Sequence, residues 1–328
     1  MTLHPSVAAV RVPVRAALSR LVEGGVVAVA CSGGADSLAL ASAAVFEGHK
    51  LGMRIIGVTV DHGLQAGSAE QADRVVAQLA GMGVDETATA RVEVDNASGL
   101  GPEAAAREAR YAVLEEVAAR VGAGKVLLGH TLDDQAETVL LGLTRGSGGR
   151  SLQGMRPDFG VFVRPLLGVR RDDTVTACQV EGLRFWDDPH NHDPGYTRVR
   201  VRERVLPLLE AELGPGIAEA LARTADQLRE DTHLLDRLTD DALARARRPG
   251  GLDVASLGSE PPSLRHRAIH RTALEAGTPA SELTRGHVLE VDQLLVGWRG
   301  QRWVDLPGHL RALRRDGLLV VERARETP

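Results

Sequence analysis

The chain has 328 residues and a formal net charge of −5, which allows two domains and argues against a protein that coats nucleic acid or anionic membranes without specificity. It contains only two cysteines, too few for a disulfide framework or for a metal site made of thiolates. No apolar run approaches the roughly 20 residues that cross a bilayer, and the N-terminus lacks the apolar core of a signal peptide, so we expect a cytoplasmic protein with no membrane partner.

The first 145 residues alternate short β-branched runs with helical patterns. The runs predict strands at Val26–Ala30, Ile55–Val60, Arg91–Asp95 and Lys125–Gly129. A helix is expected after each strand, at Ser37–Glu47, Ser68–Met82, Pro102–Val121 and Leu132–Leu143. Strands that alternate with helices pair in parallel and are covered on both faces. The predicted fold class is therefore α/β, with a parallel sheet flanked by helices.

The rest of the chain has a different pattern. Residues 145–171 are rich in Gly and Arg, and 187–196 form a connector with two prolines. Helical patterns follow at 201–212, 215–248, 263–276 and 283–295, and 302–322 predicts a small hairpin. We expect a catalytic domain over residues 1–197 and a second, mainly helical domain over 198–328 that binds the polyanionic partner inferred below.

Charge is distributed unevenly along the chain. Residues 1–144 carry 11 basic and 17 acidic side chains, whereas 145–171 hold six arginines and a single acidic residue, Asp158. A local basic strip on an acidic protein indicates a defined polyanionic partner rather than general affinity for polyanions.

Polar residues follow the predicted strands. They lie at 31–34, 61–63, 95–96 and 130–131, directly after the four strands. In parallel α/β sheets, ligands bind beyond the carboxyl ends of the strands. That edge of the sheet is the predicted active site.

The loop after the first strand reads Ser32-Gly33-Gly34-Ala35-Asp36-Ser37 and leads into a helix. Its glycines let backbone N–H groups approach phosphate oxygens, and the helix N-terminus adds partial positive charge. Asp36 is unusual beside an anion unless it holds Mg²⁺ that bridges to the phosphates. The loop lacks the Gly-Lys-Ser/Thr ending of a Walker loop, which disfavours kinase-like transfer.

This Ser-Gly-Gly-X-Asp-Ser pattern resembles the PP-loop ATP pyrophosphatases, which have an adenine nucleotide alpha hydrolase-like fold. Within them, the His130–Thr138 segment resembles the signature His-x-x-Asp-Asp-Gln-x-Glu-Thr of the tRNA(Ile)-lysidine synthetase family. Further blocks match that family in order: 145–155, 164–167, 188–208 and 306–308. The chain departs from the family pattern at Gln65, His190 and Val199.

The resemblance implies an ATP-dependent ligase that forms a carbon–nitrogen bond. In that family, ATP adenylates the wobble cytidine of the CAU anticodon of isoleucine tRNA, with release of pyrophosphate. The ε-amine of free L-lysine then attacks carbon 2 and releases AMP, which changes codon reading from AUG to AUA. The sequence leaves the oligomeric state open, with a homodimer among the alternatives.

Site residues follow from the motifs and from the resemblance. Residues 130, 134, 137 and 141 share one helical face by their 3–4 spacing. The resemblance assigns lysine binding to Asp134 and Glu137, and catalysis to these two with Asp36 and Arg107. The expected ATP-binding residues are Ser32, Gly33, Gly34, Ala35, Asp36, Ser37, His62 and His130. The expected tRNA-binding residues are Arg145, Arg150, Arg198 and Arg200, with a second cluster at Arg265, His266, Arg267 and Arg271.

Three other functions compete with this interpretation. A 2-thiocytidine-type tRNA thiolase would need paired cysteines, and the chain has no Cys-x-x-Cys. A small-molecule synthetase such as an NAD synthetase would not need the basic 145–171 strip. A non-catalytic nucleotide sensor would not need Asp36, Asp134 and Glu137 beside phosphates.

Overall fold

The computed structural model describes residues 3–61, 68–91, 102–145 and 149–324. The chain divides into two compact units, Met1–Gln227 and Leu228–Pro328, called unit 1 and unit 2 below. Helix α9 (Ile217–Ala246) contains the point of division. The expected boundary at 197/198 lies inside unit 1, and the assignment of catalysis and tRNA binding to two separate domains stays a prediction.

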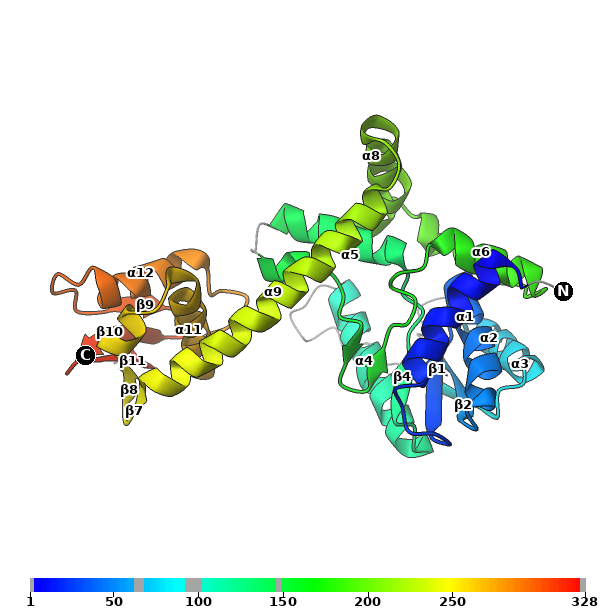
Figure 1. Cartoon of the computed structure of the whole chain (residues 1–328), viewed down its shortest axis with the longest axis horizontal. Helices are drawn as coiled ribbons and strands as arrows, with labels where there is room; N and C mark the ends of the chain where they lie inside the picture. Colours follow the sequence, from blue (N-terminus) through cyan, green and yellow to red (C-terminus); the bar gives the residue numbers. More distant parts are fainter. Residues whose placement is uncertain (1–2, 62–67, 92–101, 146–148, 325–328) are drawn as a thin grey trace. The chain divides into compact units, whose positions relative to one another are not determined.

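Unit 1 is built on a six-stranded sheet with the order β3-β2-β1-β4-β6-β5. Strands β1, β2 and β4 of this sheet are labelled in Figure 1. All neighbours pair in parallel except β5 and β6, which are antiparallel. The α/β class with a mostly parallel sheet is therefore confirmed. The strands are β1 (Val26–Ala30), β2 (Arg54–Asp61), β3 (Glu86–Arg91), β4 (Lys125–Leu127), β5 (Asp158–Phe159) and β6 (Phe162–Val163).

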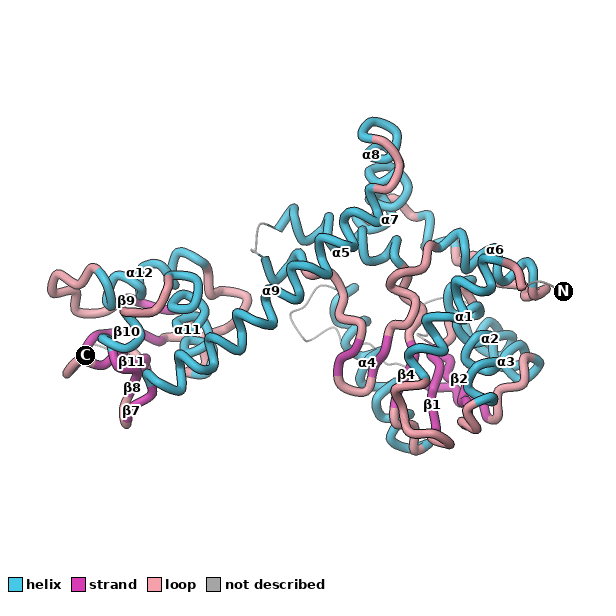
Figure 2. Tube along the Cα trace, in the orientation of Figure 1, coloured by secondary structure: helices cyan, strands magenta, loops and turns pink. Residues whose placement is uncertain are grey.

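Helices cover both faces of this sheet (Figures 1 and 2). Val27 and Val29 of β1 belong to the core shared with α1, α2, α3 and α6, whereas Ala28 packs with Leu114 of α4 on the other face. This alternation follows the two-residue period of a strand. The helices are α1 (Pro5–Leu18), α2 (Ala35–Lys50), α3 (Ser68–Gly81), α4 (Pro102–Val121), α5 (Leu132–Arg145), α6 (Arg171–Val180), α7 (Thr197–Arg200) and α8 (Leu206–Leu213).

Irregular helical turns complete unit 1. Short 3-10 turns lie at η2 (Gly149–Leu152) and η3 (Pro189–His192), and a π-helical turn, η4 (Val201–Val205), joins α7 to α8. A single π turn inside a helical run is frequent at functional sites because it changes the direction in which side chains point.

The third strand differs from its expected position. Of Arg91–Asp95, the described part is Arg91 alone, and this residue ends β3 (Glu86–Arg91). The β3 sequence is polar because the strand forms the edge of the sheet and stays partly exposed, so its pattern carries little apolar signal. Helices α1 and α6, which the sequence reading did not predict, also pack on the sheet.

Unit 2 combines helices with a second sheet, which is antiparallel. Its order is β7-β8-β11-β10-β9, so the expected C-terminal hairpin, β10 with β11, is the centre of a five-stranded sheet. The elements are β7 (Arg247–Arg248), β8 (Gly251–Asp253), α10 (Val254–Gly258), α11 (Pro262–Glu275), α12 (Arg285–Val296), β9 (Val304–Leu306), β10 (Leu310–Arg315) and β11 (Leu318–Arg323). Across the described residues of both units, no helix is long and apolar enough to span a bilayer.

Candidate active site

The turn between β1 and α2 has the backbone of an anion-binding loop. Gly33 has a φ of +85°, and a Cβ there would lie 2.7 Å from Cγ2 of Val75, so both conformation and space require glycine. Ser37 Oγ accepts from the Ser32 backbone N–H at 3.2 Å and donates to the Gly34 carbonyl at 2.9 Å. The turn therefore presents the N-terminus of α2, a 16-residue helix, to a ligand at the carboxyl edge of the sheet.

The neighbouring strand β4 brings a second loop to the same edge. A Cβ at Gly129 would lie 3.1 Å from the backbone carbon of Asp36, so glycine lets the chain after β4 pass close to the start of α2. Asp134 then accepts from the backbone N–H of Thr131 at 2.9 Å and from its hydroxyl at 3.1 Å, which fixes the start of α5. The loop at residues 32–37, called the phosphate loop below, thus lies beside the predicted lysine site.

Three carboxylates and two arginines join the two loops. Arg171 Nη2 lies 3.2 Å from Asp36 Oδ2 and 3.2 Å from Asp134 Oδ1. Arg202 donates to Glu137 Oε1 at 2.6 Å and to Glu137 Oε2 at 3.0 Å, and its Nη2 lies 3.2 Å from Asp134 Oδ1. We call these five residues the site network.

Two further side chains touch this network. The Thr174 hydroxyl donates to Asp36 Oδ1. Arg198 approaches Glu137 Oε2 with Nε at 3.6 Å and donates to the Thr138 hydroxyl at 3.3 Å. Arg198, expected at the tRNA, therefore contacts the predicted lysine site directly.

The surroundings shift the pKa values of the three network carboxylates in different directions. Burial raises the pKa of Asp36 against the opposing charge of Arg171. Burial also opposes the ionisation of Asp134, but the charge of Arg171 and the hydrogen bond from the Thr131 backbone N–H outweigh it and hold its pKa below the ordinary value. Burial raises the pKa of Glu137, although its hydrogen bond with Arg202 acts the other way. Neighbouring carboxylates with opposite shifts are suited to different roles in proton transfer.

His130 is held in one tautomer by a buried arginine. Arg164 donates from Nε to His130 Nδ1 at 3.2 Å, from Nη1 to the Arg156 carbonyl at 2.6 Å and from Nη2 to the Tyr111 hydroxyl at 2.8 Å. Arg107 donates to the same hydroxyl at 2.9 Å. Burial lowers the pKa of His130 to about 3, so the ring is neutral and Nε2 carries the proton. Arg107 and His130 thus belong to one hydrogen-bonded group.

The Gln of the 130–138 motif has a structural role. Gln135 Oε1 accepts from the Met155 backbone N–H at 2.6 Å, and its Nε2 donates to the Met155 carbonyl at 3.2 Å. A Cβ at Gly154 would lie 2.4 Å from Gln135 Oε1, which explains the glycine there. The interaction ties the 152–155 block to α5.

Asp36 and Asp134 have the donor chemistry of a magnesium site. Both approach the same nitrogen of Arg171, so a cation already lies between them. Mg²⁺ is commonly held by one or two carboxylates together with substrate phosphates. Within the described ranges, no cluster of three or more His, Cys, Asp or Glu forms a metal site by itself.

The 145–171 strip is less exposed than its composition indicated. Arg164 is buried, Arg170 pairs with Asp133 at 3.4 Å, and Arg171 belongs to the site network. These three arginines were expected in a polyanion-binding strip, but carboxylates and neutral acceptors of unit 1 already bind them. A count of arginines in a sequence does not distinguish internal from external partners.

The other predicted residues have varied positions. Arg150 is exposed in η2, and Arg200 donates to the carbonyls of Pro194 and Gly195 at 2.6 and 3.0 Å. Arg145 ends α5, and its side chain lies outside the described part of the structure, as does the whole of His62.

The basic cluster expected in unit 2 is neutralised internally. Arg265 is buried and donates to both oxygens of Asp292, at 2.5 and 3.1 Å, and His266 Nε2 lies 3.4 Å from the same carboxylate. Arg267 and Arg271 pair with Asp236 and Asp240 of α9. These four side chains thus contact acids of the same unit, and their contact with RNA stays a prediction.

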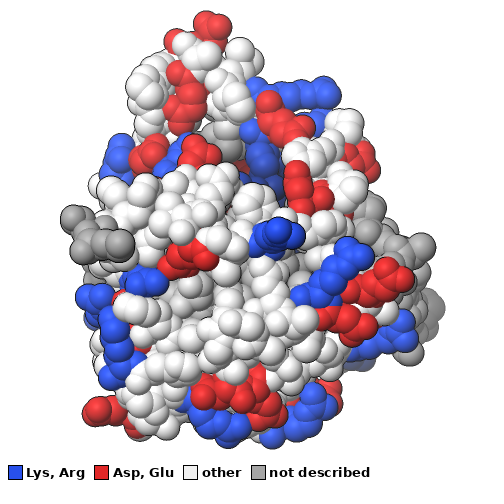
Figure 3. Space-filling model, turned by 90° about the vertical axis from the view of Figure 1, so that its right-hand side faces the viewer, with Lys and Arg blue, Asp and Glu red and all other residues white. Residues whose placement is uncertain are grey.

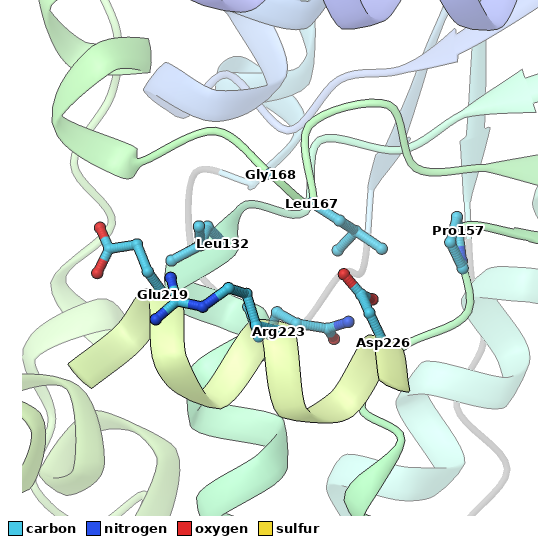
Figure 4. Close-up of a pocket in the computed structure, with 9 residues that line it drawn as sticks. Leu132, Pro157, Leu167, Gly168, Glu219, Arg223 and Asp226 are labelled. Atoms are coloured by element: carbon cyan, nitrogen blue, oxygen red, sulfur yellow. The ribbon is translucent and has the colours of Figure 1, made fainter. Parts of the chain in front are cut away.

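A cavity of about 310 Å³ lies in unit 1 beside α5 (Figure 4). Glu219, Arg223 and Asp226 of α9 line one side, and Leu132 and Leu167 lie opposite. None of the predicted site residues lines it, and the chemistry is therefore expected at the strand ends instead.

One face of the molecule carries mixed charge. Figure 3 shows Lys and Arg interspersed with Asp and Glu around uncharged side chains. In unit 1, Arg11 of α1 pairs with Glu181 at 2.6 Å and Arg15 with Glu47 at 2.8 Å. Among its coloured side chains, the face in Figure 3 shows no continuous basic area of the kind that binds a polyanion.

Sequence reasoning missed Arg171, Thr174 and Arg202. Arg202 lies four residues after Arg198 in an Arg-x-Arg-x-Arg run, a helical spacing that could have grouped the two. Arg171 and Thr174 open α6 three residues apart, but nothing local in the sequence connects them with Asp36.

Comparison with known proteins gives two family matches. A PP-loop domain model matches residues 12–209, and a TilS substrate binding domain model matches residues 252–320. A tRNA(Ile)-lysidine synthase of Thermobifida fusca is 54% identical over 97% of this chain and 98% of its own length. One of Streptomyces coelicolor is 54% identical over 90% of this chain and 85% of its own length.

A solved structure supports the fold independently. The U34-tRNA thiolase NcsA from Methanococcus maripaludis superposes with a TM-score of 0.57 at 21% identity, over 69% of this chain and 80% of its own. The sequence matches cover both units and include the motifs around the site network. The chain belongs to the tRNA(Ile)-lysidine synthase family.

Proposed function

We propose that this chain is an ATP-dependent ligase that joins free L-lysine to carbon 2 of the wobble cytidine in the CAU anticodon of isoleucine tRNA. Support comes from membership of the family and from one observation in particular. The phosphate loop of β1 and the carboxylates of α5 are connected by Arg171, which contacts Asp36 and Asp134 at once. A site for phosphates and a site for an amine are thus adjacent.

In the first step, cytidine oxygen 2 attacks the α-phosphorus of ATP. The new oxygen–phosphorus bond replaces the bond to the β-phosphate oxygen, and pyrophosphate leaves. Ser32, Ser37 and the backbone N–H groups at the start of α2 would hold the phosphates. Neutral His130, with its proton on Nε2, would donate to ATP without adding charge, and Arg107 would stabilise the negative charge of the phosphoryl group that joins AMP to the base.

Asp36 and Asp134 would hold Mg²⁺, which when bound neutralises phosphate charge and favours pyrophosphate as a leaving group. Arg171 contacts both carboxylates and would also attract the phosphates of ATP bound beside them. A guanidinium can attract phosphate charge in this way because it is always protonated.

In the second step, the ε-nitrogen of lysine attacks carbon 2 of the cytosine ring. The new carbon–nitrogen bond forms, the bond from carbon 2 to the AMP oxygen breaks, and AMP leaves. An ammonium with a pKa of about 10.4 must first lose a proton. Glu137, whose pKa is raised by burial, is the suited acceptor, whereas Asp134 stays anionic and orients the amine.

Lysine entry would exchange one cation for another. Arg202 holds both oxygens of Glu137, and the incoming ammonium carries the same charge as this guanidinium. The carboxylates therefore keep a positive partner during the exchange, which avoids the large cost of a bare buried charge.

The cysteines argue against sulfur transfer. Cys31 and Cys178 are both buried, and burial raises the pKa of each thiol, that of Cys178 to about 12. Because the thiolate is the reactive species, neither is suited to carry sulfur. The likeness to the tRNA thiolase is therefore limited to the fold.

The test is incorporation of labelled lysine into an unmodified isoleucine tRNA transcript with a CAU anticodon, in the presence of ATP and Mg²⁺. We expect one lysine per tRNA, with AMP and pyrophosphate released in equal amounts. A transcript with a GAU anticodon is the matched control, because it lacks the wobble cytidine. Lysine incorporation that ignored the anticodon, or no incorporation by folded protein that binds ATP, would reject the proposal.

A further inference from the structure

The loop between α12 and β9 in unit 2 exposes two of the three tryptophans of the chain. Trp298 is 49% exposed and Trp303 is 44% exposed, at the two ends of this short loop, Gly297–Trp303. Burial of a large aromatic ring such as that of tryptophan stabilises a fold more than burial of a smaller side chain. The chain has few such rings, because Phe, Trp and Tyr make up 3% of its residues. Two exposed rings in one loop therefore indicate a binding surface.

Hydrogen bonds within the loop hold it in a defined shape. Gln301 Nε2 donates to the Gly297 carbonyl at 3.3 Å, and Gln301 Oε1 accepts from the Arg299 backbone N–H at 2.6 Å. Trp298 Nε1 donates to the Gln301 carbonyl at 3.3 Å. A partner that binds here pays little for ordering the loop, because the rings are already positioned.

Arginines from β10 lie against both rings. The guanidinium carbon of Arg314 is 4.8 Å from the ring centroid of Trp298, and that of Arg311 is 5.3 Å from the ring centroid of Trp303. A cation against an aromatic ring is a favourable contact that also supports the ring for a further stacking partner.

The loop and the adjoining strand form a basic segment in an acidic chain. Residues 297–315 contain five arginines and a single acidic residue, Asp305, whereas the whole chain has a net charge of −5. Arg311 and Arg315 pair with Glu322 at 2.7 and 3.0 Å. Arg299 and Arg302 are exposed, and no described carboxylate forms an ion pair with either of them. Their charge is available to a partner.

We propose that Trp298, Arg299, Arg302 and Trp303 form an RNA-binding surface that takes unpaired bases and adjacent phosphates of the substrate tRNA. Aromatic rings stack on bases of any sequence, and arginines neutralise phosphates, so this composition matches single-stranded RNA. Val296, at the end of α12, is exposed, but the four exposed residues between the two rings are Arg, Gly, Gln and Arg, which disfavours a protein partner. The assignment rests on the proposed function, which supplies tRNA as the partner.

The experiment is a fluorescence and binding titration of the full chain with the CAU isoleucine transcript. Stacking quenches tryptophan emission, and the third tryptophan, Trp186, lies in unit 1. We expect tRNA to quench the wild type strongly and a Trp298→Ala/Trp303→Ala double variant weakly. The double variant should also bind about tenfold or more weakly, since each base–aromatic stack is worth about 1–3 kcal/mol.

Charge is tested separately from stacking. An Arg299→Gln/Arg302→Gln double variant should lower the slope of log affinity against log salt by up to about 2, the value for two phosphate contacts. Arg285→Gln at the opposite end of α12 is the matched control, because it removes an exposed positive charge elsewhere in unit 2. It should lower the slope less than half as much as the double variant.

The outcomes separate this proposal from the proposed function. Wild type that binds and modifies tRNA, with loop variants that melt normally and bind tRNA equally well, would overturn the surface and leave the function standing. Wild type that neither binds nor modifies tRNA would remove both. Loop variants that change the sedimentation of the protein but not its tRNA affinity would mean that the surface binds protein, and would also overturn the proposal.

Discussion

Two sets of arginine–carboxylate contacts in this chain are built differently. In unit 2, Arg265 donates to both oxygens of Asp292, and its third nitrogen donates to the Glu260 carbonyl at 2.8 Å. In unit 1, by contrast, Arg171 is shared by Asp36 and Asp134. The pair in unit 2 is closed, because Arg265 contacts a single carboxylate, whereas in unit 1 Arg171 and Arg202 are each shared by two carboxylates.

This difference indicates different uses. A closed, buried pair has no donor to offer a ligand, and loss of one member leaves the other charged and unsolvated. A shared network can exchange a guanidinium for a metal ion or an ammonium, since another opposite charge is always near. We therefore expect substitutions in the network to change turnover and substitutions in the closed pair to change stability.

The largest effect is expected for Glu137→Gln. The amide cannot accept the ammonium proton, so lysine transfer should fall about 10²- to 10⁴-fold, the usual contribution of a general base. Pyrophosphate release should persist, because it belongs to the earlier step. Both products are measured in one reaction with labelled lysine and labelled ATP.

Glu219→Gln is the matched control for this variant. Glu219 is also a carboxylate of unit 1 and pairs with an arginine, Arg170, at 3.4 Å, but it lies outside the site network. It should keep lysine transfer within a few-fold of the wild type. Equal loss in Glu219→Gln and Glu137→Gln would mean that the network has no special part in amine transfer.

Asp292→Asn tests the closed pair. The change leaves Arg265 buried without a carboxylate, and we expect unit 2 to lose about 3–5 kcal/mol of unfolding free energy. Chemical denaturation followed by the emission of Trp298 and Trp303 reports on this unit. The double variant Arg265→Met/Asp292→Leu should recover most of the loss, and failure to do so would show that the pair contributes more than charge compensation.

The third effect is a pH dependence of stability due to His130. Its pKa is lowered to about 3 in the folded protein, against about 6.5 in the unfolded chain. The neutral ring therefore contributes its full stability above about pH 6.5 and loses it as pH falls toward the folded value. Between pH 8 and pH 5, protonation of this group should lower the free energy of unfolding by up to about 2 kcal/mol.

His130→Gln should remove the part of the stability loss at low pH that is due to this ring. Urea denaturation at pH 8 and at pH 5 gives the loss for each protein, and the variant should lose up to about 2 kcal/mol less than the wild type. An identical loss in the two proteins would show that the ring is not held neutral by its surroundings.

The same comparison shows which residues the sequence could identify. Asp36, Asp134 and Glu137 lie in short motifs next to strand ends, so local spacing was enough to group them. Arg171 and Arg202 reach Asp134 from 37 and 68 residues away in the chain. No local pattern encodes such contacts, which depend on how α6 and η4 pack.

The fold shows a similar division. Strand β1 and helix α4 occur with the predicted bounds, because their apolar patterns and the proline at the start of α4 are local signals. The edge strand β3 was misplaced, since partial exposure removes the apolar pattern. The internal pairing of Arg265 was also missed, because composition cannot show where a guanidinium points.

The smallest effect is expected for Arg164→Lys. Arg164 is a third kind of arginine, different from Arg265 in the closed pair and from Arg171 in the site network. Within the described part of the chain, Arg164 pairs with no carboxylate and donates instead to His130, Tyr111 and a backbone carbonyl. Lysine keeps the charge but cannot hold these acceptors in one plane. We expect the KM for ATP to rise about tenfold, with kcat nearly unchanged, because Arg164 positions His130 and takes no part in the chemistry. Arg156→Lys, on the exposed neighbour whose carbonyl accepts from Arg164, should leave both constants unchanged. A fall in kcat with an unchanged KM would instead mean that Arg164 contacts the reacting atoms and belongs with the site network.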